Sequence, residues 1–230
     1  MKIDAVFREE RLNLGVAGRK KDQTRTELTR NTFLEKSYEL FSSRTIESVT
    51  MSEIAKASGF KDMTLYRYFQ SKPILVVAVA TWKWKKVWEE NRIRVPNEDF
   101  SKMTAAELFG HYLDSFLAMY RNHRDLLRFN QFFNIYIQSE NIERDVMKPY
   151  DEMIRDLRTA FHMIYVKAEH DHTFRTDEPE EEVFSKTLHL MLAAVTRYAV
   201  GLVYVPEKYF NDMDELEYER NLIFRDYTVK

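Results

Sequence analysis

The sequence contains no cysteine, and it has only five glycines and five prolines among 230 residues. Without cysteine, neither a disulfide nor a thiolate metal site can form, so a reducing cytoplasm suits the chain. The scarcity of glycine and proline leaves few turns and predicts long helices. Since 44% of the residues are hydrophobic, the chain can bury one sizeable core, and its length fits a small domain plus a larger one.

Targeting and membrane segments are also missing. The first 25 residues are charged throughout and lack the apolar core of a signal peptide. The most apolar run, 188–205, is nearly long enough to cross a bilayer, but it contains His189 and Arg197 and follows three glutamates in the same predicted helix. We therefore expect a buried helix and no membrane partner.

Signatures of catalysis and of metal binding are equally scarce. The sequence has no glycine-rich phosphate loop, no nucleophile elbow and no His-Glu-x-x-His. Its single Glu-x-x-His lies at Glu169 to His172, whereas a di-metal helical bundle needs that motif on two helices. We interpret this segment as a polar helix end, with a single divalent ion as the alternative. No enzyme, cofactor or metal is predicted.

The charge is distributed unevenly, although the net value is only −2. Residues 1–75 carry a net charge of +4, whereas residues 76–230 carry −6. The N-terminal part is therefore the part suited to neutralising phosphates, and the acidic remainder disfavours indiscriminate binding to polyanions.

Residues 50–72 read TMSEIAKASGFKDMTLYRYFQSK and predict two short helices joined by a tight turn. Thr50 and Glu53 have the spacing of a capping box, which starts the first helix. Gly59 suits the turn, and Asp62 offers a cap for the second helix. This arrangement is a helix-turn-helix, whose second helix enters the DNA major groove. The residues expected on its outer face or at its flanks are Met63, Thr64, Tyr66, Arg67, Tyr68 and Lys72.

Residues 33–75 resemble the DNA-binding domain of TetR-family repressors. The matching pieces are Leu40-Phe41, Glu53-Ile54-Ala55, Ala57-Ser58-Gly59-Phe60, Thr64-Leu65-Tyr66, Tyr68-Phe69 and Ser71-Lys72. Together they are specific, although they cover about a fifth of the chain. The sequence departs from the family pattern at Thr45, Lys61 and Met63, where glycine or another small residue is usual.

The resemblance implies an all-α protein with an N-terminal three-helix DNA-binding domain and a larger helical domain for effector binding and dimerisation. The boundaries that we predict are a basic arm at 1–23, the helix-turn-helix domain at 24–75 and the helical domain at 76–230. The arm is interpreted as a solvated tail, with a role along the DNA as the alternative. The helices predicted outside the helix-turn-helix are 26–43, 73–92, 104–121, 124–138, 143–168, 180–204 and 212–227, with a linker at 96–99.

At matching positions, the resemblance implies two kinds of DNA contact. The residues expected to hold phosphates are Thr50, Ser52, Tyr66 and Lys72. The candidates for base edges and nearby backbone are Lys61, Met63, Thr64, Arg67 and Tyr68. The dimer would bind a near-palindromic double-stranded operator, most simply as a repressor that a small-molecule effector releases.

The larger domain offers an aromatic face for such an effector, since Phe129, Phe132, Phe133 and Tyr136 share one side of a helix. The plain interpretation is core packing, and the alternative is a pocket wall. The residues proposed as pocket lining are Trp88, Phe116, Tyr120, Phe129, Phe133, Tyr136 and Tyr150. The resemblance places the homodimer interface on helices 180–204 and 212–227, where a buried Arg197 would need a carboxylate or an anionic effector as partner.

The sequence therefore favours a cytoplasmic, ligand-responsive transcriptional regulator. The alternative is a helical module that binds small molecules or proteins and whose DNA-binding head is degenerate. The departures at Thr45, Lys61 and Met63 motivate this alternative.

Overall fold

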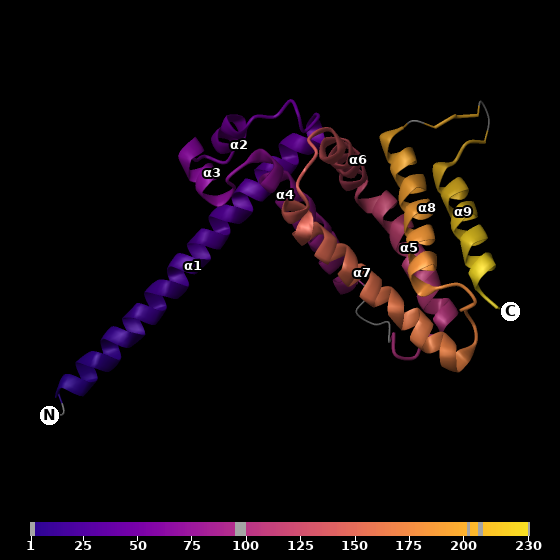
Figure 1. Ribbon diagram of the computed structural model, residues 1–230, viewed down its shortest axis with the longest axis horizontal. Helices are drawn as coiled ribbons and strands as arrows, with labels where there is room; N and C mark the ends of the chain where they lie inside the picture. The colour runs from indigo at the N-terminus through magenta and orange to yellow at the C-terminus, as the bar shows by residue number, and fades with distance from the viewer. Residues whose placement is uncertain (1–2, 95–99, 202, 207–208, 230) are drawn as a thin grey trace. The chain divides into compact units, whose positions relative to one another are not determined.

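The computed structural model describes the backbone of residues 3–94, 100–201, 203–206 and 209–229, and the side chains of these residues except 3–22 and 91–94. The predicted linker at 96–99 lies outside the described residues. Within these ranges the fold is all-α, as predicted (Figure 1). The helices are α1 (Ile3–Ser43), α2 (Met51–Ala57), α3 (Asp62–Tyr68), α4 (Lys72–Arg94), α5 (Ala105–Asn122), α6 (Arg124–Ser139), α7 (Arg144–Asp171), α8 (Glu180–Val200) and α9 (Asp212–Tyr227).

The chain divides into two compact units, Met1–Leu75 and Val76–Lys230. Unit 1 is organised around Phe33, which is fully buried on α1. Its ring centroid lies 5.1 Å from that of Phe60, 5.6 Å from that of Tyr68 and 6.5 Å from that of Phe69. Aromatic pairs with this spacing contribute about 0.5–1.5 kcal/mol each beyond the area that they bury. α1 therefore braces both the turn before α3 and the end of α3.

The first helix is longer than the sequence predicted. α1 begins at Ile3, so the backbone of the predicted arm at 1–23 is helical from residue 3 onwards, and the predicted start near residue 26 is wrong. No proline interrupts residues 3–43, and extending a packed helix requires no new nucleus. The missing apolar periodicity in the sequence therefore does not exclude a helix.

Unit 2 is built around α5, which packs against α7, α8 and α9. Phe109 of α5 is fully buried, and its ring centroid lies 4.9 Å from that of Phe174, 5.8 Å from that of Tyr227 and 6.4 Å from that of Phe161. An isolated antiparallel bridge between Phe174 and Thr228 joins the α7–α8 connection to the end of α9. The same aromatic cluster therefore fixes four segments that are distant in sequence.

The segment interpreted as a polar helix end forms a cap for α5. An Asp171 carboxylate oxygen accepts a hydrogen bond from the Ala105 N–H at 2.7 Å, and the Thr173 hydroxyl accepts one from the Ala106 N–H at 3.0 Å. These N–H groups belong to the first turn of α5 and would otherwise lack intrahelical partners. The Asp171 carboxylate thus stabilises a helix start. Among the described residues, no group of three His, Cys, Asp or Glu side chains is placed to hold a metal.

The apolar run that forms α8 is not buried on all sides. α8 ends at Val200, not at residue 204, because Gly201 adopts φ +77° as its C-cap. Leu190 is 60% exposed, and Ala193 and Arg197 are also exposed. These residues recur at helical spacing on one face, so Arg197 is exposed in the single chain, and its predicted burial in a dimer interface stays a prediction. No described helix is long and apolar enough to cross a membrane.

A candidate DNA-binding site and an aromatic cluster

The helix-turn-helix begins with the capping box that the sequence predicts. The Glu53 N–H donates to the Thr50 hydroxyl at 3.2 Å, and the Thr50 N–H donates to the Glu53 carboxylate at 2.8 Å. The Arg44 guanidinium donates to the other carboxylate oxygen at 2.8 Å. Together the Thr50 backbone, Arg44 and the Thr50 hydroxyl hold the pKa of Glu53 at about 2. Sequence reasoning missed Arg44, because no fixed spacing links a residue before the loop to the capping box.

The turn between α2 and α3 is a Schellman motif around Gly59. The Phe60 N–H donates to the Ala55 carbonyl at 2.9 Å, and the Gly59 N–H donates to the Lys56 carbonyl at 3.1 Å. Gly59 has φ +76°, a conformation that disfavours residues with a Cβ. Phe60 then continues towards Phe33. The turn thereby fixes the direction in which α3 leaves α2.

The start of α3 differs from the prediction. Asp62 is the first helical residue rather than the cap, and Lys61 is the N-cap without a side-chain hydrogen bond to the helix. The Asp62 carboxylate in the first turn still complements the positive end of the helix dipole. α3 therefore lacks a cap contribution that is typically about 1 kcal/mol, and its position depends on tertiary packing.

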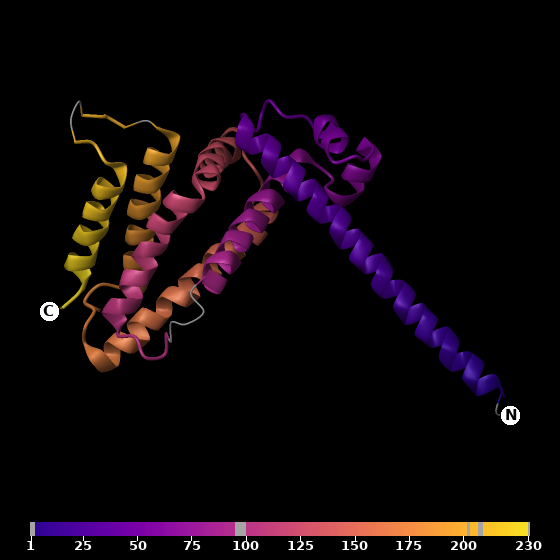
Figure 2. The same ribbon diagram turned by 180° about the vertical axis from the view of Figure 1, so that it is seen from behind.

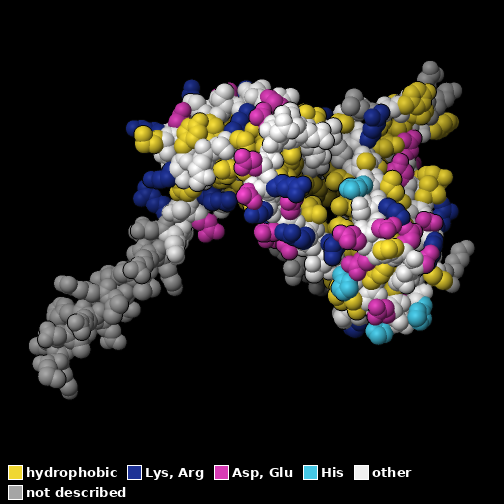
Figure 3. All heavy atoms as spheres, in the orientation of Figure 1, with side chains coloured by type: hydrophobic (Ala, Val, Ile, Leu, Met, Phe, Trp, Pro, Cys, Tyr) yellow, Lys and Arg dark blue, Asp and Glu magenta, His cyan; other side chains and the backbone are white. Residues whose placement is uncertain are grey.

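The outer face of α3 is presented much as predicted. Met63 is 84% exposed and Tyr66 is 48% exposed, and Lys61 and Arg67 are also exposed, whereas Leu65 is fully buried. In the orientation of Figure 3, Lys and Arg side chains lie beside hydrophobic ones over the part of unit 1 that carries α2 and α3. This mixture offers both charge for phosphates and apolar surface for base edges.

Two of the predicted base-contacting residues lie nearer the core. Tyr68 is half-buried and packs against Phe33, and Thr64 is also half-buried. The Arg67 guanidinium lies 5.7 Å from the centroid of the Tyr68 ring. Tyr68 thus lies between the core of unit 1 and the exposed Arg67. The sequence had placed Tyr68 on the outer face of the helix and did not indicate this position.

The residues assigned to phosphates surround α3. Ser52 is exposed in the first turn of α2, whereas the Thr50 hydroxyl is already engaged in the capping box. Lys72, the first residue of α4, donates its ammonium group to the Glu47 carbonyl at 3.1 Å. This hydrogen bond ties the start of α4 to the loop before α2 and orients the Lys72 side chain.

The three departures from the TetR pattern cause no backbone strain. Among the described residues, positive φ angles outside glycine occur at Asn141, His172 and Tyr209, and therefore not at Thr45, Lys61 or Met63. None of these three positions requires a glycine for its backbone conformation. The observation that motivated a degenerate DNA-binding head is thus accommodated by an ordinary helix-turn-helix backbone.

In unit 2, the structure brings part of the predicted aromatic set together. Phe129 and Phe133 are fully buried, with ring centroids 6.1 Å apart, and the Tyr150 ring of α7 lies 4.9 Å from that of Phe133. Burial raises the pKa of Tyr150 to about 12. Tyr136 is buried on the same face of α6, and Trp88 is half-buried on α4.

The two α5 residues of that set take part in other contacts. Tyr120 donates its hydroxyl to the Asp212 carboxylate at the start of α9, and the Arg124 guanidinium lies 4.1 Å from the centre of its ring. Phe116 packs edge-on against Tyr112, with ring centroids 5.3 Å apart. Open hollows lie along α9 and along α1, and none of the seven predicted residues lines either of them.

Comparison with known proteins shows which family the helix-turn-helix region is similar to. The family model described as bacterial regulatory proteins, tetR family, matches residues 33–79. An uncharacterized HTH-type transcriptional regulator of Mycobacterium tuberculosis is 37% identical over 71 residues, which are 31% of this chain and 35% of that protein. The aligned part thus spans about a third of the length of the curated relative.

Solved structures extend the likeness to the fold of nearly the whole chain. A putative transcriptional regulator from Saccharomonospora viridis, in complex with choline, has a TM-score of 0.67 at 14% identity over 89% of this chain and all of that one. The regulator FadR from Bacillus subtilis, in complex with stearoyl-CoA, has a TM-score of 0.63 at 13% identity over 84% of this chain and 96% of that one.

Taken together, the fold and the site define an all-helical protein with an N-terminal helix-turn-helix DNA-binding domain. The family model lies on that domain, and its helices carry the capping box and the Schellman turn described above. Residues 33–79 match the TetR family of bacterial regulatory proteins, the family that the sequence resembles.

Proposed function

We propose that the protein binds a near-palindromic operator as a homodimer and represses transcription in the cytoplasm until a small-molecule effector releases it. The exposed outer face of α3, held in place by the Phe33 cluster, is the observation that carries this proposal. Each α3 would enter one major groove, and the two half-sites would lie about one helical turn apart.

The DNA contacts divide into two roles by chemistry and exposure. Lys72, Tyr66 and Ser52 would hold phosphates and set affinity, because phosphate contacts carry no sequence information themselves. Met63 would contact a thymine methyl, and Arg67 would contact guanine or a neighbouring phosphate. Tyr68 and Thr64 border the same surface, with Tyr68 positioning Arg67 from the core side.

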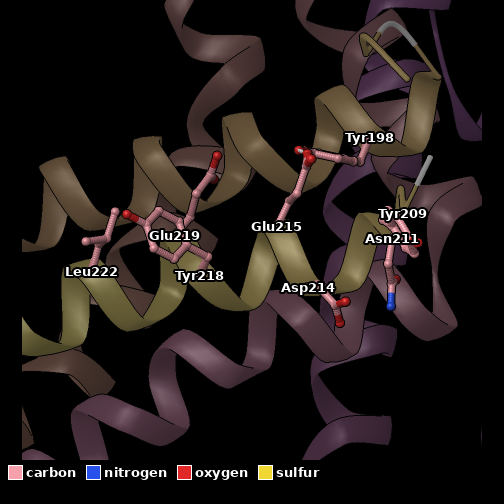
Figure 4. A pocket seen from close by; sticks show the side chains of 8 residues that line it. All are labelled: Tyr198, Tyr209, Asn211, Asp214, Glu215, Tyr218, Glu219 and Leu222. Carbon is pink, nitrogen blue, oxygen red and sulfur yellow. Dashed lines mark hydrogen bonds between the residues drawn. The ribbon is translucent and has the colours of Figure 1, made fainter. Parts of the chain in front are cut away.

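The homodimer is supported by an unpaired surface on α8, α9 and their connection. Its exposed apolar residues are Leu190, Tyr204, Val205, Tyr209, Tyr218 and Leu222. Figure 4 shows Tyr209, Tyr218 and Leu222 around an open hollow that also holds Asp214, Glu215 and Glu219. α8 and α9 lie side by side in Figures 1 and 2, so a second copy would complete a four-helix bundle.

Charge on the same surface fits a second copy. The hollow is acidic, and burial together with Glu215 raises the pKa of Glu219. Arg197 is exposed on α8 and has the charge to pair with these carboxylates across the interface. Analytical ultracentrifugation tests the assembly: Leu190→Glu should convert dimer to monomer, whereas Met163→Glu, at an exposed residue of α7, should not. Two dimeric variants would exclude this interface.

Effector binding is proposed for the body of unit 2. The aromatic cluster of Phe129, Phe133 and Tyr150 supports it, as do the choline and stearoyl-CoA bound by the two structural relatives. To release DNA, an effector must bind more tightly to the dimer conformation in which the two DNA-binding domains do not fit the operator. An effector with equal affinity for both conformations would not shift the equilibrium between them.

The first experiment measures binding of the purified protein to duplex DNA from around its own coding region. Fluorescence anisotropy, with salt titrated and random duplex as competitor, should give binding that resists the competitor and weakens steeply with salt. If that DNA binds no better than random duplex, selection from a random pool follows. Failure to enrich any sequence would contradict the proposal and favour a binding module with a non-functional head.

A further inference from the structure

Unit 2 contains buried polar atoms that no described group satisfies. The indole N–H of Trp84 on α4 and the side-chain carbonyl oxygen of Asn130 on α6 are both shielded from solvent, and neither has a hydrogen-bond partner among the described residues. Asn130 is only 2% exposed. Leaving such groups unpaired is costly, because burial removes their hydration without replacing it.

Two other buried hydroxyls of unit 2 do have hydrogen-bond partners. The Thr81 hydroxyl donates to the Val77 carbonyl at 2.9 Å, and the Thr187 hydroxyl donates to the Val183 carbonyl at 2.8 Å. A hydroxyl on a helix can donate to the backbone carbonyl four residues earlier in the same helix. The indole N–H of Trp84 has no such partner among the described residues.

Contacts of and beside Trp84 connect α4 to α6, the helix that carries Asn130. Lys83 of α4 forms an ion pair with Asp125 of α6 at 3.7 Å, which places the adjacent Trp84 near the first half of α6, where Asn130 lies. Trp84 also packs against the buried cluster that includes Leu127 of α6. α6 in turn packs against α8, whose Thr196 hydroxyl is buried and likewise without a partner among the described residues.

The surroundings specify the charge of a ligand. Among the described residues of unit 2, no Lys, Arg, Asp or Glu is buried. The charged neighbour of Trp84, Lys83, is already paired with Asp125, so a charged ligand would lose its hydration without gaining an unpaired counter-charge. The indole N–H can only donate, and the Asn130 oxygen can only accept, so a ligand that satisfies both must present an acceptor and a donor.

We propose that Trp84 and Asn130 are the polar anchors of the effector site, and that the effector is an uncharged, mainly apolar molecule carrying a donor–acceptor group such as a primary amide. The role of this site in regulation rests on the proposed function. The binding chemistry itself rests on the two unsatisfied atoms.

The test uses the full-length protein and matched probes. Three apolar scaffolds (naphthalene, biphenyl and decane) are each prepared as the parent hydrocarbon, primary amide, carboxylate and alkylammonium. Binding is measured by calorimetry and by tryptophan fluorescence. At least one amide should bind about 10-fold more tightly than its carboxylate and its ammonium counterpart. A carboxylate or ammonium that binds most tightly on every scaffold, or amides that all fail to bind, would overturn the proposal.

Two variants distinguish anchors from ordinary core residues. Trp84→Phe and Asn130→Leu should each weaken the best amide about 5-fold to 10-fold, the loss expected for one hydrogen bond, while leaving the parent hydrocarbon unaffected. Thr187→Val is the matched control, because its hydroxyl is already bonded within α8, and it should not alter amide binding. Unchanged amide affinity in both anchor variants would mean that ordered water satisfies these atoms, and would refute the assignment.

Stability and DNA binding provide independent measurements. If the Asn130 oxygen awaits a ligand, Asn130→Leu removes an unsatisfied group and should not lower the unfolding midpoint of the ligand-free protein. A marked loss would indicate a structural hydrogen bond instead. Operator binding of the unmodified protein is measured separately: amide selectivity without DNA binding would leave the ligand site standing and the regulatory function refuted.

Discussion

Replacing Gly59 with alanine isolates the energetic contribution of the turn between α2 and α3. At φ +76° an added Cβ would meet no atom within 4 Å, so the substitution introduces no clash. The cost is therefore the left-handed backbone alone, about 1–2 kcal/mol for an L-residue. Alanine also restricts the unfolded chain, which offsets about 0.4–1 kcal/mol. The middle values of these two ranges predict that Gly59→Ala lowers the stability of unit 1 by about 0.8 kcal/mol, and Gly59→Asn by less.

Hydrogen exchange followed by mass spectrometry reads this loss locally, because unit 1 and unit 2 need not unfold together. Peptides that cover α2 and α3 should exchange faster in Gly59→Ala, with the asparagine variant in between. Gly201 is the matched control in unit 2, with φ +77° and likewise no atom within 4 Å of an added Cβ. Gly201→Ala should destabilise the end of α8 by a similar amount and leave α2 and α3 unchanged. The argument from backbone strain would be refuted if Gly59→Ala were as stable as the parent. It would also be refuted if α2 and α3 were less protected from exchange in Gly59→Asn than in Gly59→Ala.

Three further predictions follow from contacts in both units. Because the pKa of Glu53 is lowered to about 2, its contribution to stability is present above its ordinary value near 4.5 and is lost as pH falls towards 2; acid titration of Glu53→Gln by circular dichroism should show a weaker dependence. Gly110→Ala would place a Cβ 3.0 Å from the Arg220 side chain and 3.3 Å from the Phe224 ring; overpacking of about 1–3 kcal/mol, less about 1 kcal/mol for the better helix propensity of alanine, predicts a net loss of up to about 2 kcal/mol in urea denaturation, whereas a stabilised variant would contradict the packing. Lys72→Ala should reduce the salt slope of DNA binding by about one unit, and Lys148→Ala in unit 2 should leave it unchanged.

Most helix positions were predictable because local signals mark their ends. Thr104 with Glu107, like Thr50 with Glu53, forms a complete capping box, and the predicted helix at 104–121 lies within one residue of α5. The helices predicted at 124–138 and 212–227 likewise agree closely with α6 and α9. The turn at Gly59 was predictable because a Schellman motif requires a residue that tolerates positive φ.

The α1 extension and the end of α8 show where local signals mislead. Residues 3–25 have no apolar stripe, yet they continue a helix that is already nucleated downstream. At the other end, the hydrophobic run continues to residue 205, but Gly201 stops α8 four residues earlier than predicted. Hydrophobicity alone therefore does not define where a helix begins or ends.

The candidate sites were less predictable than the helices, because the contacts that define them join distant residues. Arg44 reaches the Glu53 carboxylate across a loop, and Tyr68 finds Phe33 on α1. The same reason separates Tyr120 from the aromatic cluster in which the sequence placed it. Its hydroxyl contacts Asp212, ninety-two residues away, so Tyr120 fixes the start of α9 to α5. An aromatic pattern on one helix specifies which residues face inward, and only the partner helices determine whether those residues hold the fold together or contact a ligand.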